Sequence, residues 1–190
     1  TEIHVQNPNV ELQFPDGNSI YSRSKVVYHD ISFPNDIAIN SGDKVIFTLP
    51  SELQFKTSYS VNVYNPNNEV VGIAQVDPKN NSVVTTFNHY FEDHPIGKYM
   101  NLELDTLYSE ALKGGEKLHL NFNGHVVNVT VGSANPIPSD EVIAKWGSQD
   151  KNDPTLINWG MRLNYARRVL NNLQLIDTWS DNQRFVDNSL

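Results

Sequence analysis

The chain has 190 residues, a length that allows one domain of ordinary size and part of another. Its formal net charge of −8 argues against nucleic acid and anionic membranes as partners, because both bind basic surfaces. The chain contains no cysteine, which excludes disulfides and thiolate metal sites, and no apolar run approaches the roughly 18 residues of a membrane span.

Residues 1–132 have the pattern of a β domain. Apolar and polar residues alternate over short stretches rich in β-branched and aromatic side chains, and proline, glycine and asparagine separate these stretches. Asn123-Gly124 is a signal for a tight hairpin turn. Strands are expected at residues 10–14, 25–33, 44–49, 59–64, 70–76, 82–87, 100–107, 117–122 and 125–131. The sequence therefore predicts an all-β protein whose first domain is an antiparallel β-sandwich.

Residues 133–143 have the composition of a linker, stiffened by Pro136 and Pro138. The segment that follows, 144–190, contains all three tryptophans and gives conflicting local signals. Asp153-Pro154 resembles a helix start, and apolar residues then follow at helical spacing, which favours an amphipathic helix over Pro154–Leu173. The alternative is a pair of strands, Leu156–Tyr165 and Leu173–Thr178, around a turn at Asn171-Asn172.

Conventional catalytic and metal-binding patterns are weak in this sequence. His89 and His94 are five residues apart, a spacing that places them on one face of neither a helix nor a strand. No glycine pattern of a nucleophile elbow surrounds a serine, and no glycine-rich phosphate loop is present. We therefore expect no enzymatic activity, no cofactor and no metal site. The aromatic cluster Tyr90, Phe91 and Tyr99 is the candidate for a carbohydrate-binding surface.

Three sequence segments follow one another along the chain. They are Ile37–Val45 leading into Phe47–Pro50, then Glu69–Ala74, then Thr85–Phe91. In this order and spacing they resemble the immunoglobulin-like N1 subdomain of Gram-positive, cell-wall-anchored surface adhesins of the collagen-adhesin type. The tail resembles the opening of the following N2 subdomain, through Lys145 with Gly147, Trp159 with Asn164, and Leu175–Asp177. The resemblance implies an immunoglobulin-like sandwich over residues 1–132 and an incomplete second sandwich over residues 144–190.

In that family the N2 subdomain often contains an intramolecular isopeptide bond. By the resemblance, Lys145 would be the amine and Asp177 the assisting acid, and the acceptor asparagine would lie on a later strand, outside this chain. Such a bond needs an apolar site, because burial favours the neutral, nucleophilic amine and the protonated acid. The tryptophans Trp146 and Trp159 would supply that environment. With its acceptor absent, we expect the bond to be unmade in residues 1–190.

The resemblance further implies a non-enzymatic adhesin that holds a host extracellular-matrix protein or a glycan between its subdomains. The linker from Ser133 to Ile143 would close over this ligand, and signal and anchor segments of a cell-wall protein would lie outside the chain. Collagen-binding relatives tend to carry aromatic residues where this sequence has Ala144 and Gly160, which argues against collagen. Weak or absent collagen binding by residues 1–190 is expected.

Two other functions fit the same sequence. The chain could be a stalk module without a ligand of its own, or a carbohydrate-binding sandwich. An incomplete second domain would also expose strand edges, so pairing with a second chain is a further expectation.

Overall fold

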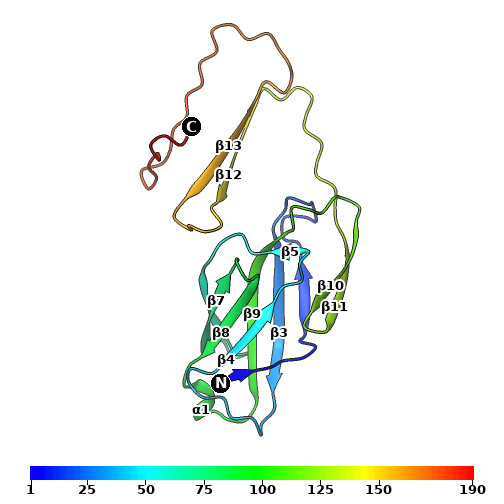
Figure 1. Cartoon of the computed structure of the whole chain (residues 1–190), viewed down its shortest axis with the longest axis vertical. Helices are drawn as coiled ribbons and strands as arrows, with labels where there is room; N and C mark the ends of the chain where they lie inside the picture. Colours follow the sequence, from blue (N-terminus) through cyan, green and yellow to red (C-terminus); the bar gives the residue numbers. More distant parts are fainter. The chain divides into compact units, whose positions relative to one another are not determined.

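The computed structural model describes all residues from Thr1 to Leu190, and nearly all its regular structure is β (Figure 1). The strands are β1 (Glu2–Ile3), β2 (Val10–Gln13), β3 (Ser24–Phe33), β4 (Lys44–Thr48), β5 (Leu53–Gln54), β6 (Ser60–Tyr64), β7 (Val70–Asp77), β8 (Ser82–Phe87), β9 (Lys98–Tyr108), β10 (Lys117–Phe122), β11 (His125–Thr130), β12 (Ile143–Gln149) and β13 (Ile157–Leu163). The one helix, α1 (Tyr90–Asp93), is far too short to cross a membrane.

The first eleven strands build an antiparallel sandwich. One group runs β4-β8-β7-β6, with β1 added in parallel at the β4 edge, and the other runs β2-β3-β9, with β5 added to β9. The two groups join at one corner, where Tyr64 of β6 pairs with Asn101 of β9. A bulge interrupts the β3–β9 pairing between Tyr28 and Ile31, and bulges of this kind bend a strand and increase its twist. The predicted all-β sandwich is confirmed.

The hairpin β10–β11 closes one side of the sandwich (Figure 1). Its turn residues Asn123 and Gly124 both have positive φ angles, 51° and 100°, the backbone required by the predicted two-residue turn. Alternate residues of β10 then point inward, and Leu118, Leu120 and Phe122 are buried in the core. The turn thus sets the register that places these side chains inside.

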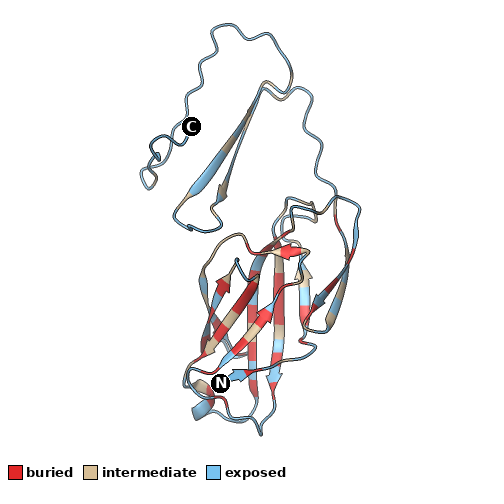
Figure 2. Ribbon diagram, in the orientation of Figure 1, coloured by how far each residue is buried: buried red, intermediate tan, exposed pale blue.

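The core lies between the strand groups, where buried residues appear as red bands along the ribbons (Figure 2). Aromatic rings pack against one another among its aliphatic side chains: Tyr28 stacks on Phe47 with ring centroids 4.3 Å apart, and Phe33 meets Phe87 edge-on at 5.6 Å. Ser24 and Thr106, the buried polar pair of β3 and β9, satisfy each other through hydroxyls 2.8 Å apart. This burial supplies the main stabilisation of the domain.

The predicted strands of residues 1–131 all form, within one or two residues at their ends. Three short elements were not predicted: β1, β5 and α1. The two strands have two residues each and show no alternation to detect, while the single turn α1 begins where Asn88 Oδ1 accepts the Tyr90 N–H at 2.8 Å. Elements this short depend on tertiary context rather than on local pattern.

The predicted helix over Pro154–Leu173 is wrong, since β13 occupies its first half. Asp153 does not cap a helix: its carboxylate accepts the backbone N–H and the hydroxyl of Thr155 at 2.9 and 2.6 Å, a local turn. Asn164 and Arg167 then adopt positive φ angles of 53°, which no α-helix accommodates. The alternative strand at Leu156–Tyr165 is confirmed, whereas Leu173–Thr178 forms no strand.

The chain divides into two units, residues 1–136 with 146–160 and residues 137–145 with 161–190. The boundaries predicted from the sequence, a domain to residue 132 and a linker over 133–143, stay a prediction. Residues 164–190 contain turns and extended backbone without regular strands or helices.

We expect two conservative substitutions in the core to have opposite effects. The Tyr28 hydroxyl is buried without a hydrogen-bond partner, so Tyr28→Phe should raise the free energy of unfolding by about 1 kcal/mol. The buried Tyr108 donates a hydrogen bond from its hydroxyl to Asn18 Oδ1 at 2.5 Å, so Tyr108→Phe should lower the free energy of unfolding by about 1 kcal/mol. Urea unfolding followed by far-UV circular dichroism measures both, and a loss of stability in Tyr28→Phe would contradict the first expectation.

Candidate functional site

Two tryptophans and two glycines fix the β12–β13 hairpin. A Cβ atom at Gly160 would lie 2.6 Å from Cε2 of Trp146, and one at Gly147 would lie 2.8 Å from Cζ3 of Trp159. Each indole therefore covers the glycine of the opposite strand, at a distance that excludes any side chain there. The hairpin is closed at both ends, by Asp150 N–H to Leu156 O at 2.8 Å and by Asn164 N–H to Val142 O at 2.6 Å.

This register gives the hairpin two different faces. Side chains alternate along each strand, so Lys145 shares a face with Gly147 and with the Trp159 ring that covers it. Ile157, Met161 and Leu163 extend the same face along β13, which makes it strongly apolar. Trp146 lies on the opposite face, beside Ala144 and Ser148. Of the two tryptophans predicted to surround the amine, only Trp159 is on the correct face.

The structure brings the two predicted cross-link residues together. The Lys145 ammonium Nζ lies 2.5 Å from Oδ1 of Asp177, although the residues are 32 positions apart. The side chains are 31% and 37% exposed, so water reaches both groups. In this state the contact is an ion pair, and an ion pair with such exposure contributes little stability. The pair has the right members for the cross-link chemistry, but the apolar cover that the chemistry requires is not in place.

A second charged pair in this part of the chain was not predicted. Arg162 Nε donates to Glu141 Oε2 at 2.7 Å, and its Nη2 donates to Oε1 at 3.1 Å. The guanidinium also lies over the Tyr165 ring, 5.6 Å from its centroid. Hydrogen bonding from Arg162 lowers the pKa of the Glu141 carboxyl. Only the hairpin register brings these residues together, and no sequence pattern marks it.

The predicted ligand-contacting linker, Ser133 to Ile143, is divided by the structure. Its first residues, 133–140, are exposed, and Ile137 is an exposed apolar side chain. Its last residues, 141–143, are paired with the segment that follows β13 or lie within β12. The interpretation of the whole segment as a ligand-contacting linker stays a prediction.

The aromatic cluster considered for carbohydrate binding does not form an exposed platform. Phe91 is buried in the core, Tyr90 stacks on His94 with ring centroids 4.3 Å apart, and Tyr99 is exposed. The hydroxyl of Tyr90 donates to Glu69 Oε1 at 3.0 Å. His89 instead binds Glu92 through Nδ1 at 2.7 Å, a contact that raises the pKa of His89. Three coplanar exposed rings, as a sugar-binding face would have, are not present.

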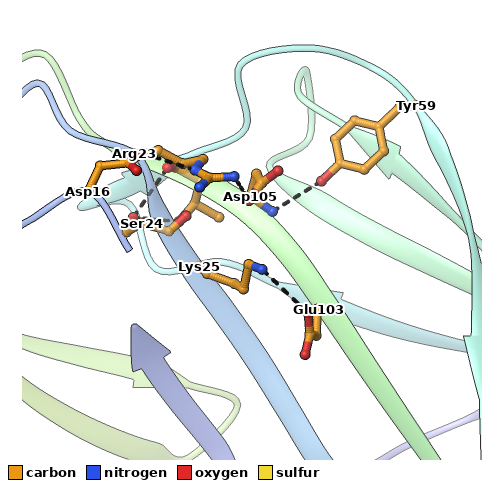
Figure 3. Close-up of polar contacts among 8 residues, drawn as sticks. Asp16, Arg23, Ser24, Lys25, Tyr59, Glu103 and Asp105 are labelled. Atoms are coloured by element: carbon orange, nitrogen blue, oxygen red, sulfur yellow. Dashed lines mark hydrogen bonds and ion pairs between the residues drawn. The ribbon is translucent and has the colours of Figure 1, made fainter. Parts of the chain in front are cut away.

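The outer surface of β3 and β9 carries a ladder of charged contacts (Figure 3). Arg23 lies between Asp16 and Asp105, at 3.2 and 3.5 Å, and Lys25 Nζ lies 3.5 Å from Glu103 Oε2. The Asp105 N–H donates to the Tyr59 hydroxyl at 3.3 Å. These contacts are long and exposed, so they support strand pairing weakly and do not form a catalytic site.

Two family models match the chain in succession. Residues 20–108 match the model described as "Bacterial Ig domain", and residues 140–190 match the model described as "Collagen binding domain". The first match lies within the sandwich, and the second includes the β12–β13 hairpin, Lys145 and Asp177.

The chain is also similar to known bacterial proteins. The chain is 31% identical to a wall-associated protein of Streptococcus mutans, over 85% of the chain and 36% of that protein, so it spans about a third of the relative's length. A serine-rich repeat adhesion glycoprotein of Streptococcus agalactiae shares the fold at 11% identity, with a TM-score of 0.53 over 84% of this chain and 57% of that one. The collagen adhesin of S. aureus gives a lower TM-score of 0.48, at 18% identity over 81% and 51% of the two chains. The resemblance inferred from the sequence motifs is confirmed: the chain combines a match to a bacterial Ig domain with a match to a collagen-binding domain.

Proposed function

We propose that the chain is a ligand-binding module of a bacterial surface adhesin, exposed outside the cell and attached to the cell wall through other parts of the protein. The observation that carries the proposal is the order of the two matches, an Ig domain and then a collagen-binding domain, in one chain. The ligand would be a host extracellular-matrix protein of extended form. A collagen-type triple helix is the first candidate, because the second match is to a collagen-binding domain.

The absence of aromatic side chains at positions 144 and 160 argued against collagen, and the hairpin geometry weakens that argument. Trp146 lies on the same face as Ala144, and its ring covers Gly160. The indole thus occupies the space in which a side chain at residue 160 would stand. Trp146 is 50% exposed, so one flat aromatic surface is presented on an otherwise polar face. An indole held in this way suits an extended chain rich in proline, whose rings pack against aromatic surfaces.

In a chain that includes the whole second domain, Trp146→Ala should therefore weaken binding to a triple-helical collagen peptide by about tenfold or more. The reason is that truncation of a tryptophan to alanine causes a large loss of affinity at many interfaces. Surface plasmon resonance measures the affinity. Gly160→Ala should act in the same direction, because its Cβ would displace the indole.

Tyr21→Ala provides the matched control, since Tyr21 is an exposed aromatic residue of the first domain. Its affinity should equal that of the unmodified chain. If Trp146→Ala bound collagen with the same affinity as the unmodified chain, the role of this indole would be contradicted. If the chain with its whole second domain binds no matrix protein at all, the spacer function is favoured over the adhesin function.

The pair of Lys145 and Asp177 supports a second part of the proposal, an isopeptide cross-link in the complete second domain. The neutral Lys145 amine would attack the carboxamide carbon of an asparagine on a later strand. The new C–N bond would form as ammonia leaves, and protonated Asp177 would polarise the carboxamide oxygen by donating a hydrogen bond. The apolar face around Lys145 would become buried once the later strands cover it, and burial favours both uncharged forms.

In a chain that includes the whole second domain, the intact mass should fall short of the sequence mass by one ammonia. Lys145→Ala should abolish this loss, and Asp177→Asn should slow or abolish it, because the amide cannot supply the acidic proton. Lys151→Ala changes an exposed lysine of the neighbouring loop and should leave the loss in place. High-resolution mass spectrometry distinguishes these outcomes, and a full sequence mass in the unmodified chain would reject the cross-link without affecting the proposal of adhesion.

A further inference from the structure

The Glu141 side chain is held more firmly than its position in a predicted linker suggests. Both of its carboxylate oxygens accept hydrogen bonds from Arg162, at 2.7 and 3.1 Å. Only 15% of the Glu141 side chain is exposed, against 35% of that of Arg162. A two-pronged arginine–carboxylate pair of this kind fixes orientation as well as distance. Of the ion pairs in the chain, it is the one with two side-chain hydrogen bonds from a single arginine to a single carboxylate.

The backbone around Glu141 is held by the same segment. The Glu141 carbonyl accepts the Ala166 N–H at 2.9 Å, and the Val142 carbonyl accepts the Asn164 N–H at 2.6 Å. Asn164 in turn fixes the turn beyond it, since its side chain accepts from Arg168 N–H and donates to Arg168 O, both at 2.8 Å. The end of the predicted linker is therefore bound on both its main chain and its side chain.

Arg162 is itself held in place at both ends of its side chain. Its backbone belongs to β13, and its guanidinium lies over the Tyr165 ring. Stacking and hydrogen bonding together restrict a side chain that otherwise has many rotamers. The Arg162 guanidinium that binds Glu141 thus has a fixed position on the hairpin.

The residues before Glu141 have no comparable restraint. Residues 134–140 are exposed, and residues 134–137 take part in no backbone hydrogen bond. The first backbone bond after this stretch runs from the Glu141 N–H to the Pro138 carbonyl, at 3.1 Å. Ser133 still lies close to Gly114 of the first domain, where a Cβ would be 2.8 Å from Ser133 Cα. The unrestrained backbone is therefore a short segment, Ala134 to Ile137.

We propose that Glu141 and Arg162 form an anchor that divides the predicted linker of residues 133–143 into two parts. Residues 141–143 move with the β12–β13 hairpin, and Ala134–Ile137 alone acts as the hinge. The consequence for binding rests on the proposed function: the segment able to close over a ligand is about a third of the predicted linker, four residues of eleven. Glu141 and Arg162 are positioning residues that set the length of this segment.

Amide hydrogen exchange in residues 1–190 tests the anchor without any ligand. In Glu141→Gln, exchange at the Asn164 and Ala166 amides should accelerate roughly fivefold or more, because their acceptors lie on the released segment. Arg162→Lys, which keeps the charge but loses the two-pronged geometry, should give a smaller acceleration. Ala134, Asn135 and Ile137 should exchange at nearly unprotected rates in every variant.

The pH dependence provides a readout that a general loss of stability would not reproduce. Because Arg162 lowers the pKa of folded Glu141, the anchor is present above the ordinary glutamate pKa of about 4.3 and is lost as the pH falls through the lower folded value. Protection at Asn164 and Ala166, corrected for intrinsic rates, should fall in that acidic range in the unmodified chain. In Glu141→Gln, protection at these two amides should not change with pH over the same range.

Glu103→Gln is the matched control, since it removes a glutamate whose single contact, to Lys25, is 3.5 Å long. It should leave exchange at Asn164 and Ala166 unchanged. Unaltered exchange at these two amides in Glu141→Gln would reject the anchor, and strong protection at Ala134 and Asn135 would reject the hinge. Neither result depends on whether the chain binds collagen, so failure of the anchor and failure of the proposed function are distinguishable.

Discussion

The arrangement of the second part of the chain depends on two indole rings that each cover a glycine across the β12–β13 hairpin. Any side chain at Gly147 or Gly160 would overlap a ring, so these contacts select one strand register. A slip of one residue would turn Lys145 from the apolar face to the polar face, away from Trp159. The position of Lys145 beside Trp159 and the exposed aromatic surface at Trp146 therefore both follow from the same packing.

Sequence patterns predicted the sandwich well because apolar and polar residues alternate along most of its strands, and proline, glycine or asparagine separate them. They failed for Pro154–Leu173, where helical spacing of apolar residues competed with Asn164, whose positive φ ends any helix. For the proposed cross-link, the family resemblance rather than a pattern suggested Lys145 and Asp177, whose contact spans 32 residues of sequence. Glu141 and Arg162 could not be predicted at all, because their contact exists only once the hairpin register is known.

The charged contacts of the chain differ in length, geometry and exposure, and these differences indicate which contacts can hold a segment in place. The ladder on β3 and β9 consists of exposed contacts of 3.2 to 3.5 Å. The pair of Glu141 and Arg162 is shorter, two-pronged and less exposed, and it is joined by backbone hydrogen bonds from the same segment. The contact of Lys145 and Asp177 is different again: it is a short ion pair of 2.5 Å whose two side chains are both partly exposed.

The pairing of β3 with β9 has a consequence for how the protein folds. Ser24 and Thr106 bond across 82 residues of sequence, whereas the two strands of the β10–β11 hairpin are joined by a two-residue turn. Local hairpins form within microseconds, but contacts this distant in sequence form slowly because a long loop must close first. During synthesis β3 emerges about 75 residues before its central partner is complete. One edge of β3 therefore stays unpaired until β9 has emerged, and an unpaired strand edge is a site at which a nascent chain can aggregate.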